Sequence, residues 1–175
     1  MTPPHAALAV IDVRVDDLGF YEGEAIARPV NAMLEATTPV MRRLEAAGGA
    51  ALQSQMRLSE PLPVGAAVVT GAGDLGVQLL IHGVVASREE PVSRASVRAA
   101  LVSTLHRVDA FRIRELAIAP FGLGAGNLDI EDSADVMIEV LREHMRRSQF
   151  PASVLIVAES ELEEQVLRAR LGGAA

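Results

Sequence analysis

Short β-branched runs alternate with segments of helical periodicity along most of the 175-residue chain, and this alternation restricts the fold more than any other feature. Several of the runs are apolar almost without interruption, as in strands that are buried on both faces. The runs lie at residues 6–14, 25–29, 64–70, 77–85, 115–120 and 154–158. The pattern predicts an α/β protein, an α/β/α sandwich whose central sheet lies between two layers of helices.

The segments between these runs carry helix start and stop signals. Thr38 is a typical N-cap, Pro39 suits the first helical position, and Gly48 and Gly49 end that helix. Asp129 is placed to cap a later helix. The predicted helices cover residues 38–47, 50–57, 93–107, 133–147 and 161–171. Because no repeat and no long linker interrupts the pattern, we expect one domain over residues 1–175.

Two absences in the composition exclude several kinds of chemistry. The chain has no cysteine, and all 16 of its basic residues are arginine. A thiolate nucleophile, a Schiff-base lysine and a phosphate loop that ends in Gly-Lys-Ser are therefore excluded. No histidine has the spacing of a metal site, so we expect neither a metal ion nor a cofactor.

The net charge of −7 argues against a broad basic surface that binds nucleic acid. No stretch approaches 18 uninterrupted apolar residues, and the first residues lack the basic region of a signal peptide. We therefore expect a cytoplasmic protein without a membrane or nucleic-acid partner. Self-association is left open.

The most informative segment is Ala-Pro-Phe-Gly-Leu-Gly-Ala-Gly-Asn-Leu at residues 119–128, between a predicted strand and a predicted helix. Gly122, Gly124 and Gly126 can adopt positive φ and let an anion approach the backbone amides. The N-terminus of the following helix adds a partial positive charge. The segment is typical of a phosphate-binding loop, and a tight turn without a ligand is the alternative.

Two stretches of the chain resemble motifs of the macro domain family. Residues 65–75 (Gly-Ala-Ala-Val-Val-Thr-Gly-Ala-Gly-Asp-Leu) and 80–82 (Leu-Ile-His) are similar to the family's "G-E-A-x-x-T-x-G-x-L…x-I-H". Residues 116–128 are similar to its second ligand loop, "I-A-F-P-x-x-G-x-G-x-x-G". The resemblance implies an α/β/α sandwich with a mixed sheet and a cleft that binds ADP-ribose or a related nucleotide.

The spacing of further positions agrees with the family. Asp17 and Leu18 stand at its adenine-binding "G-D-I" motif. Arg28 and Asn31 stand at the two asparagines of "N-A-A-N", and Val40 stands at the valine after its first glycine loop. The resemblance implies that Asp17 reads adenine, Asn31 binds a ribose hydroxyl and Val40 walls the cleft.

The full set of ligand-binding residues that the resemblance implies is Asp17, Leu18, Arg28, Asn31, Val40, Gly122, Leu123, Gly124, Ala125, Gly126 and Asn127. Each of the polar side chains has a structural alternative. Asp17 is also a typical turn cap, Asn31 a typical backbone-bonding loop residue, and Arg28 either reaches an anion or lies at the rim of the cleft. His82, on an apolar strand, is expected to be a hydrogen-bonded core residue.

The chain departs from the family at the first glycine loop. Ala36-Thr37-Thr38-Pro39 replaces its four glycines, and Pro39 has no amide hydrogen to donate to a phosphate. Glu35 adds a like charge beside any diphosphate. The loop therefore reads as a degenerate version of the family's first ligand loop.

Met41 stands where hydrolytic members of the family carry aspartate, and a thioether cannot act as a general base. We therefore expect an ADP-ribose-binding module without catalytic residues. One alternative is a hydrolase of ADP-ribosyl esters or O-acetyl-ADP-ribose, in which Asn31 and the phosphate hold a water. The other is a degenerate fold with a structural or oligomeric role.

Overall fold

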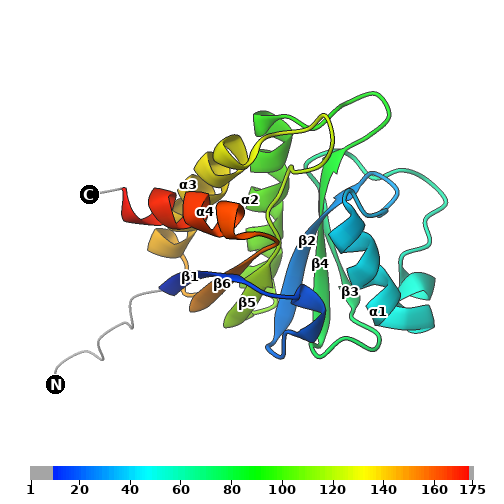
Figure 1. The fold of residues 1–175 in the computed structure, drawn as a ribbon. Helices are drawn as coiled ribbons and strands as arrows, with labels where there is room; N and C mark the ends of the chain where they lie inside the picture. Colours follow the sequence, from blue (N-terminus) through cyan, green and yellow to red (C-terminus); the bar gives the residue numbers. More distant parts are fainter. Residues whose placement is uncertain (1–9, 174–175) are drawn as a thin grey trace, which may run out of the picture.

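A computed structural model describes residues 10–173 and shows one six-stranded sheet in the order β1-β6-β5-β2-β4-β3 (Figure 1). The strands are β1 (Val10–Val15), β2 (Ala25–Asn31), β3 (Ala67–Gly71), β4 (Leu79–Ala86), β5 (Glu115–Ile118) and β6 (Ser153–Ala158). Only β3 runs antiparallel to its neighbour, β4; the other four pairs are parallel. The predicted α/β fold with a mixed sheet is confirmed.

Helices cover both faces of the sheet, as Figure 1 shows. They are α1 (Pro39–Gln55), α2 (Arg94–Ala110), α3 (Ile130–Arg147) and α4 (Glu161–Gly172), with a short 3-10 helix, η1 (Leu18–Phe20). Alternation along β2 separates the two cores: Ala25 and Ala27 pack under α2 and α3, whereas Ile26 packs under α1. The α4 helix packs against α3 and the β1 edge.

The helix boundaries follow the predicted capping signals. The Thr38 side chain accepts from the amide of Met41 at 3.2 Å, and the Asp129 side chain accepts from the amide of Asp132 at 2.8 Å. Gly49, at φ +72°, interrupts α1 and separates two helical segments, as predicted. Because Asp129 is itself the N-cap, α3 begins at Ile130, three residues before the predicted start.

The strand boundaries differ from the prediction where glycine turns the chain. The predicted strand at residues 64–70 begins only at Ala67, because Gly65 has φ +90°. Residues 6–9 of the first predicted strand lie outside the described residues, and β1 continues to Val15. In residues 10–173, no helix combines the length and the apolar character that crossing a membrane requires.

The topology places the connections that matter for a ligand at one edge of the sheet. The parallel strands end there together, and open α/β sheets bind ligands outside these carboxyl ends. Residues 32–38 link β2 to α1 and are called the first loop here; residues 119–129 link β5 to α3 and are called the second loop. Because β2 and β5 are hydrogen-bonded neighbours, the two loops lie side by side.

Candidate functional site

The second loop has a backbone that only glycine adopts readily. Gly122, Gly124 and Gly126 have φ of +88°, +131° and +78°. A Cβ on Gly122 would lie 2.6 Å from Cγ2 of Val97, so this glycine also permits the loop to pack on α2. The loop closes on itself, since the amide of Leu128 donates to the carbonyl of Gly122 at 3.0 Å.

The amides at the tip of the second loop have no acceptor within residues 10–173. This holds for all five amides of residues 122–126, of which Ala125 and Gly126 are exposed. The amide of Asn127 differs, because it donates to the carbonyl of Gly124 at 3.0 Å. The loop thus presents a short row of free amide donors, the arrangement that binds anions.

The base of the second loop is held firmly by α3. The hydroxyl of Ser133 donates to the carbonyl of Phe121 at 2.6 Å, and both residues are fully buried. The amide of Phe121 points at the sulfur of Met137, 3.3 Å away. Consequently α3 fixes the base from which the free amides extend.

The beginning of the first loop, residues 32–35, uses its polar groups internally. The side-chain oxygen of Asn31 accepts from the amides of Met33 (2.9 Å) and Glu35 (3.0 Å), and its amide group donates to Oε2 of Glu35 at 2.8 Å. We call this arrangement the Asn31 clasp. It is the backbone-bonding role that the sequence left open, and it occupies both polar atoms of the side chain that was predicted to bind ribose.

The two loops touch each other. A Cβ built on Gly124 would lie 3.2 Å from the carbonyl oxygen of Thr37 and 3.8 Å from the methyl group of Thr38. The hydroxyl of Thr37 is buried and has no partner in the described part of the chain. In the first turn of α1, Pro39 lacks an amide hydrogen and Met41 donates to the Thr38 cap, whereas the amide of Val40 has no acceptor among residues 10–173.

Arg28 does not lie at the rim of the cleft, so that part of the prediction is wrong. Strand alternation turns its side chain under α1, where it is 0% exposed. Its guanidinium donates to Nδ1 of His82 (3.0 Å), to Oε1 of Glu45 (2.6 Å) and to the carbonyl of Leu34 (3.2 Å). Burial lowers the pKa of Arg28, and the Glu45 carboxylate opposes that shift.

His82 is a hydrogen-bonded core residue, as predicted, and is 0% exposed. Its Nδ1 accepts from Arg28 and its Nε2 lies 2.9 Å from the hydroxyl of Thr70. That hydroxyl donates to the carbonyl of Gly71, so it accepts from His82, which is then neutral with the proton on Nε2. Burial, with a smaller contribution from Arg28, lowers the pKa of His82 to about 3.

Asp17 stands at the start of η1 and caps it, accepting from the amide of Gly19 at 2.9 Å. Its second carboxylate oxygen has no partner within the described residues, so the cap does not prevent a ligand contact. The Leu18 side chain is 3% exposed and packs in the core under α1, while its amide has no acceptor in the described part of the chain.

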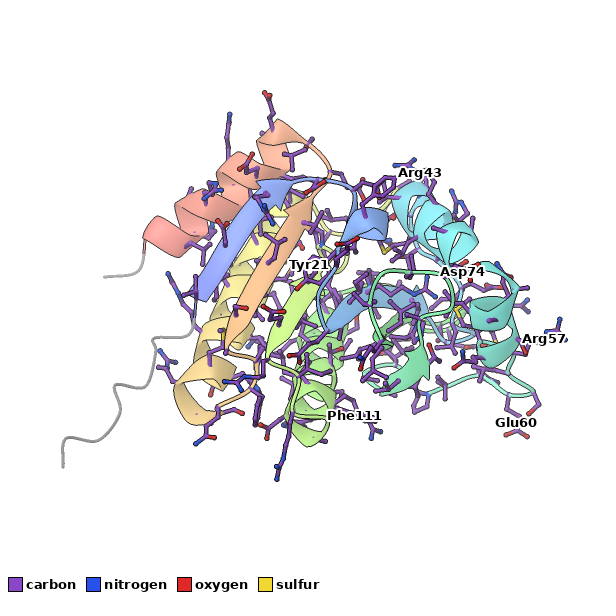
Figure 2. All side chains as sticks on the ribbon, turned by 90° about the horizontal axis from the view of Figure 1, so that it is seen from below. Tyr21, Arg43, Arg57, Glu60, Asp74 and Phe111 are labelled. Atoms are coloured by element: carbon purple, nitrogen blue, oxygen red, sulfur yellow. The ribbon has the colours of Figure 1, made fainter. Side chains whose placement is uncertain are left out.

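A cavity of about 260 Å³ adjoins Asp17 on the α1 side of the sheet. Leu155 and Val157 of β6 form part of its apolar lining, and Phe20 and Tyr21 supply aromatic side chains. Phe20 is 81% exposed, and Figure 2 labels Tyr21 among the strands. Burial and the nearby carboxylates raise the pKa of Tyr21, which is thus a neutral phenol.

The sequence did not lead us to Phe20 and Tyr21. A usable signal was present, because the chain has only five aromatic residues and two of them stand together three and four positions after Asp17. Aromatic side chains next to a carboxylate are well suited to a flat base that carries an amino group. Among residues 10–173, no three His, Asp or Glu side chains gather into a group able to hold a metal ion.

Comparisons with known proteins concern the family and the fold of the chain. A sequence model of the family described as "Macro domain" matches residues 27–137. An uncharacterized protein of Mycobacterium tuberculosis is 30% identical over 140 residues, which are 80% of this chain and 39% of that protein. This chain therefore spans about two fifths of the length of the first curated relatives that it matches.

Solved structures show the same fold at low sequence identity. The Oceanobacillus iheyensis macrodomain with MES bound has a TM-score of 0.84 at 16% identity, covering 95% of this chain and 93% of that one. The Trypanosoma brucei macrodomain in complex with ADP-ribose has a TM-score of 0.83 at 15% identity, covering 98% of this chain and 73% of that one.

Proposed function

The chain belongs to the macro domain family, and on that premise we propose that it binds ADP-ribose or a closely related nucleotide diphosphate at the carboxyl edge of its sheet. A structural neighbour with the same fold is a complex with ADP-ribose, which supports this choice of ligand class. The site that we propose uses the second loop for the diphosphate and the Asp17 end for the base.

The observation that carries the proposal is the row of five amides at residues 122–126 without acceptors in residues 10–173. Hydrogen bonds between backbone amides and a charged phosphate are each worth about 1.5–3 kcal/mol. Local amide dipoles determine the field at such a loop, so a protein of net charge −7 can still hold a diphosphate there. No cationic side chain is required.

The base end of the ligand lies at Asp17 in this proposal. The free carboxylate oxygen accepts from an exocyclic amine, and the amide of Leu18 donates to a ring nitrogen. One strand, β6, separates the end of β1 from the end of β5, so the two ends of the site are about 10 Å apart at the usual strand spacing. A nucleoside diphosphate spans that distance.

The first loop contributes less in this proposal. The amides of residues 32–35 donate inside the protein, whereas those of residues 36–38 and Val40, with the hydroxyl of Thr37, have no acceptor among residues 10–173. Met41 is 2% exposed and packs in the core, where it meets no substrate. We therefore propose binding without hydrolysis, with Asn31 supporting the loop rather than holding a water.

Isothermal titration calorimetry with ADP-ribose tests the proposal. We expect saturable heat with one site per chain, weaker binding of AMP, and no binding of adenosine at similar concentration, because the diphosphate supplies most of the hydrogen bonds. Absence of heat with ADP-ribose at about millimolar concentration, which corresponds to roughly 4 kcal/mol of binding free energy, would contradict the proposal. That result would favour the degenerate fold with a structural role.

A turnover assay separates binding from hydrolysis. The chain is incubated with a mono-ADP-ribosylated protein and, in a second arm, with O-acetyl-ADP-ribose, and released ADP-ribose is measured. We expect no release above that of a heat-denatured sample. Release that follows enzyme concentration would show a hydrolase, whose mechanism then has to work without a carboxylate at position 41.

A further inference from the structure

Leu34 holds an uncommon backbone conformation in the first loop. It is not glycine, yet its φ is +62°, a region that bulky residues rarely enter unless their surroundings hold them there. Its side chain is 3% exposed and packs with Val30, Ala32 and Val84. Its carbonyl is turned inward and accepts from Nη2 of Arg28 at 3.2 Å.

Arg28 joins this carbonyl to three other parts of the fold. Nε donates to His82 on β4, Nη1 donates to Glu45 on α1, and Nη2 also lies 3.1 Å from the sulfur of Met56, just after α1. In the sheet register Arg28 lies directly beside His82. One planar group with donors in several directions thus connects β2, β4, α1 and the first loop.

The tautomer of His82 fits the hydrogen bonds of Arg28. Because its Nε2 proton is directed to Thr70, its Nδ1 is left as an acceptor for Arg28. The charge of the guanidinium is balanced by Glu45, whose side chain is only 17% exposed. A buried ion pair of this kind gives little net stability, so its effect on the fold lies chiefly in the groups that it holds in place.

The first loop is also the segment that touches the second loop, through Thr37 and Gly124. Its course between Leu34 and the Thr38 cap therefore determines how closely the two loops approach. We infer that Arg28 is the positioning residue of the binding crevice: from inside the core it holds the Leu34 carbonyl and so keeps the first loop in place against the second. The part of this inference that concerns ligand affinity rests on the proposed function.

The test uses the variant Arg28→Met/Glu45→Gln, which removes both charges together and leaves no unpaired buried carboxylate. Amide hydrogen exchange is followed for Met33 and Glu35, whose amides the Asn31 clasp holds. We expect their exchange rates to rise about tenfold or more relative to the α3 amides, because the loop opens locally. The Kd for ADP-ribose is expected to rise about tenfold, since the loop must then be ordered on binding.

Leu105→Ala is the matched control. Leu105 is a fully buried residue of α2 in the core on the other face of the sheet from α1, so this variant lowers global stability without touching Arg28. We expect its loop amides and its α3 amides to change in step and its Kd to stay within about twofold of the wild type. If Arg28 only stabilised the fold, the Arg28→Met/Glu45→Gln variant would behave like Leu105→Ala in both measurements.

Arg28→Lys keeps the charge and serves as a second variant if the double variant does not fold. An ammonium can reach Glu45 but cannot also hold the Leu34 carbonyl and His82, so we expect regained stability with loop amides that still exchange fast. If the amides of Met33 and Glu35 exchange as slowly in these variants as in the wild type, the inference is wrong, whether or not the variants bind ADP-ribose. If the wild type binds no ADP-ribose, the proposed function is wrong, and the exchange data alone then test whether Arg28 positions the first loop.

Discussion

The first and second loops leave adjacent strands at the same edge of the sheet, yet they use their backbone amides differently. In the first loop, the amides of residues 32–35 all donate to acceptors inside the protein, and those of residues 36–38 have no acceptor among residues 10–173. In the second loop, those of residues 122–126 have no acceptor in the part of the chain that the structure describes. The second loop therefore has the longer row of backbone donors that are free for a ligand.

The difference has a cause in residue type. Glycines at positive φ turn successive amides outward in the second loop, and Ser133 holds the base of that loop from α3. The first loop has a side-chain acceptor, Asn31, and a buried donor, Arg28, which turn the backbone of residues 33–35 inward. Two loops with equivalent positions in a fold can thus have different capacities, because side chains compete with a ligand for backbone groups.

The largest expected effect comes from closing the second loop. Gly124→Val places a branched side chain at φ +131°, against Asn127 and the Thr37 carbonyl. We expect ADP-ribose affinity to fall about 100-fold, equivalent to roughly 2.7 kcal/mol or one to two charge-assisted hydrogen bonds. Calorimetry measures it, with Gly172→Val as the control, since Gly172 has open space around it. Equal affinity in the two variants would place the ligand elsewhere.

The second prediction concerns pH and the support of the first loop. The pKa of His82 is about 3 in the folded protein, below its ordinary value of 6.5, so between these pH values only the unfolded chain binds the proton. Stability from this group is therefore complete above pH 6.5 and is lost as pH falls toward 3. We expect a loss of roughly 1 kcal/mol per pH unit below pH 6.

Urea unfolding at several pH values measures this loss. His82→Gln is the matched variant, because glutamine can accept from Arg28 and donate to Thr70 without titrating. The slope of stability against pH should be smaller in His82→Gln than in the wild type. Identical slopes would mean that other groups, such as the carboxylates, account for the acid sensitivity, and would remove His82 from the explanation.

A third prediction separates the two ends of the site. Asp17→Asn keeps an acceptor for the amide of Gly19, so η1 stays capped, but it weakens the contact with an amino group of the base. We expect ADP-ribose affinity to fall about tenfold, or roughly 1.4 kcal/mol, while affinity for inorganic pyrophosphate is unchanged. An equal loss of affinity for ADP-ribose and for pyrophosphate would show that Asp17 supports the fold at this edge of the sheet and does not contact the base.

The smallest expected effect concerns the charge of Glu35 in the first loop. Glu35→Gln keeps an acceptor for Asn31 and removes a negative charge from the edge of the site. At a separation of about 10 Å in water, that charge costs a phosphate roughly 0.4 kcal/mol, so affinity should rise about twofold. The gain should vanish in high salt. Asp109→Asn, which changes an exposed carboxylate at the end of α2 and so at the opposite edge of the sheet, should leave affinity unchanged.

Local signals in the sequence were sufficient for much of the fold. The caps at Thr38 and Asp129 and the break at Gly49 all follow from the conformational preferences of single residues. The burial of His82 follows from its apolar neighbours on β4. The positive φ of the glycines in the second loop was predictable for the same reason, since no other residue adopts that backbone conformation so readily.

The side-chain partners in the candidate site were not predictable in this way. Arg28 reads as a surface residue, because arginine is rarely buried, and its partners His82 and Glu45 lie 54 and 17 positions further along the chain. Phe20 and Tyr21 gain a role only because β6 lies beside β1 and leaves an apolar floor next to them. The ligand contacts of Asp17, Val40 and the second loop remain predictions that the experiments above address.

By itself, the sequence determined the α/β layering, the caps and the glycine backbone of the second loop, because each depends on periodicity or on one residue's own conformational range. Only the tertiary structure decided that Arg28 faces inward, that Asn31 binds its own loop, and that the loop amides of residues 122–126 stay free. The physical reason is competition: a polar group bonds the nearest acceptor or donor in space, and the fold alone determines which group that is.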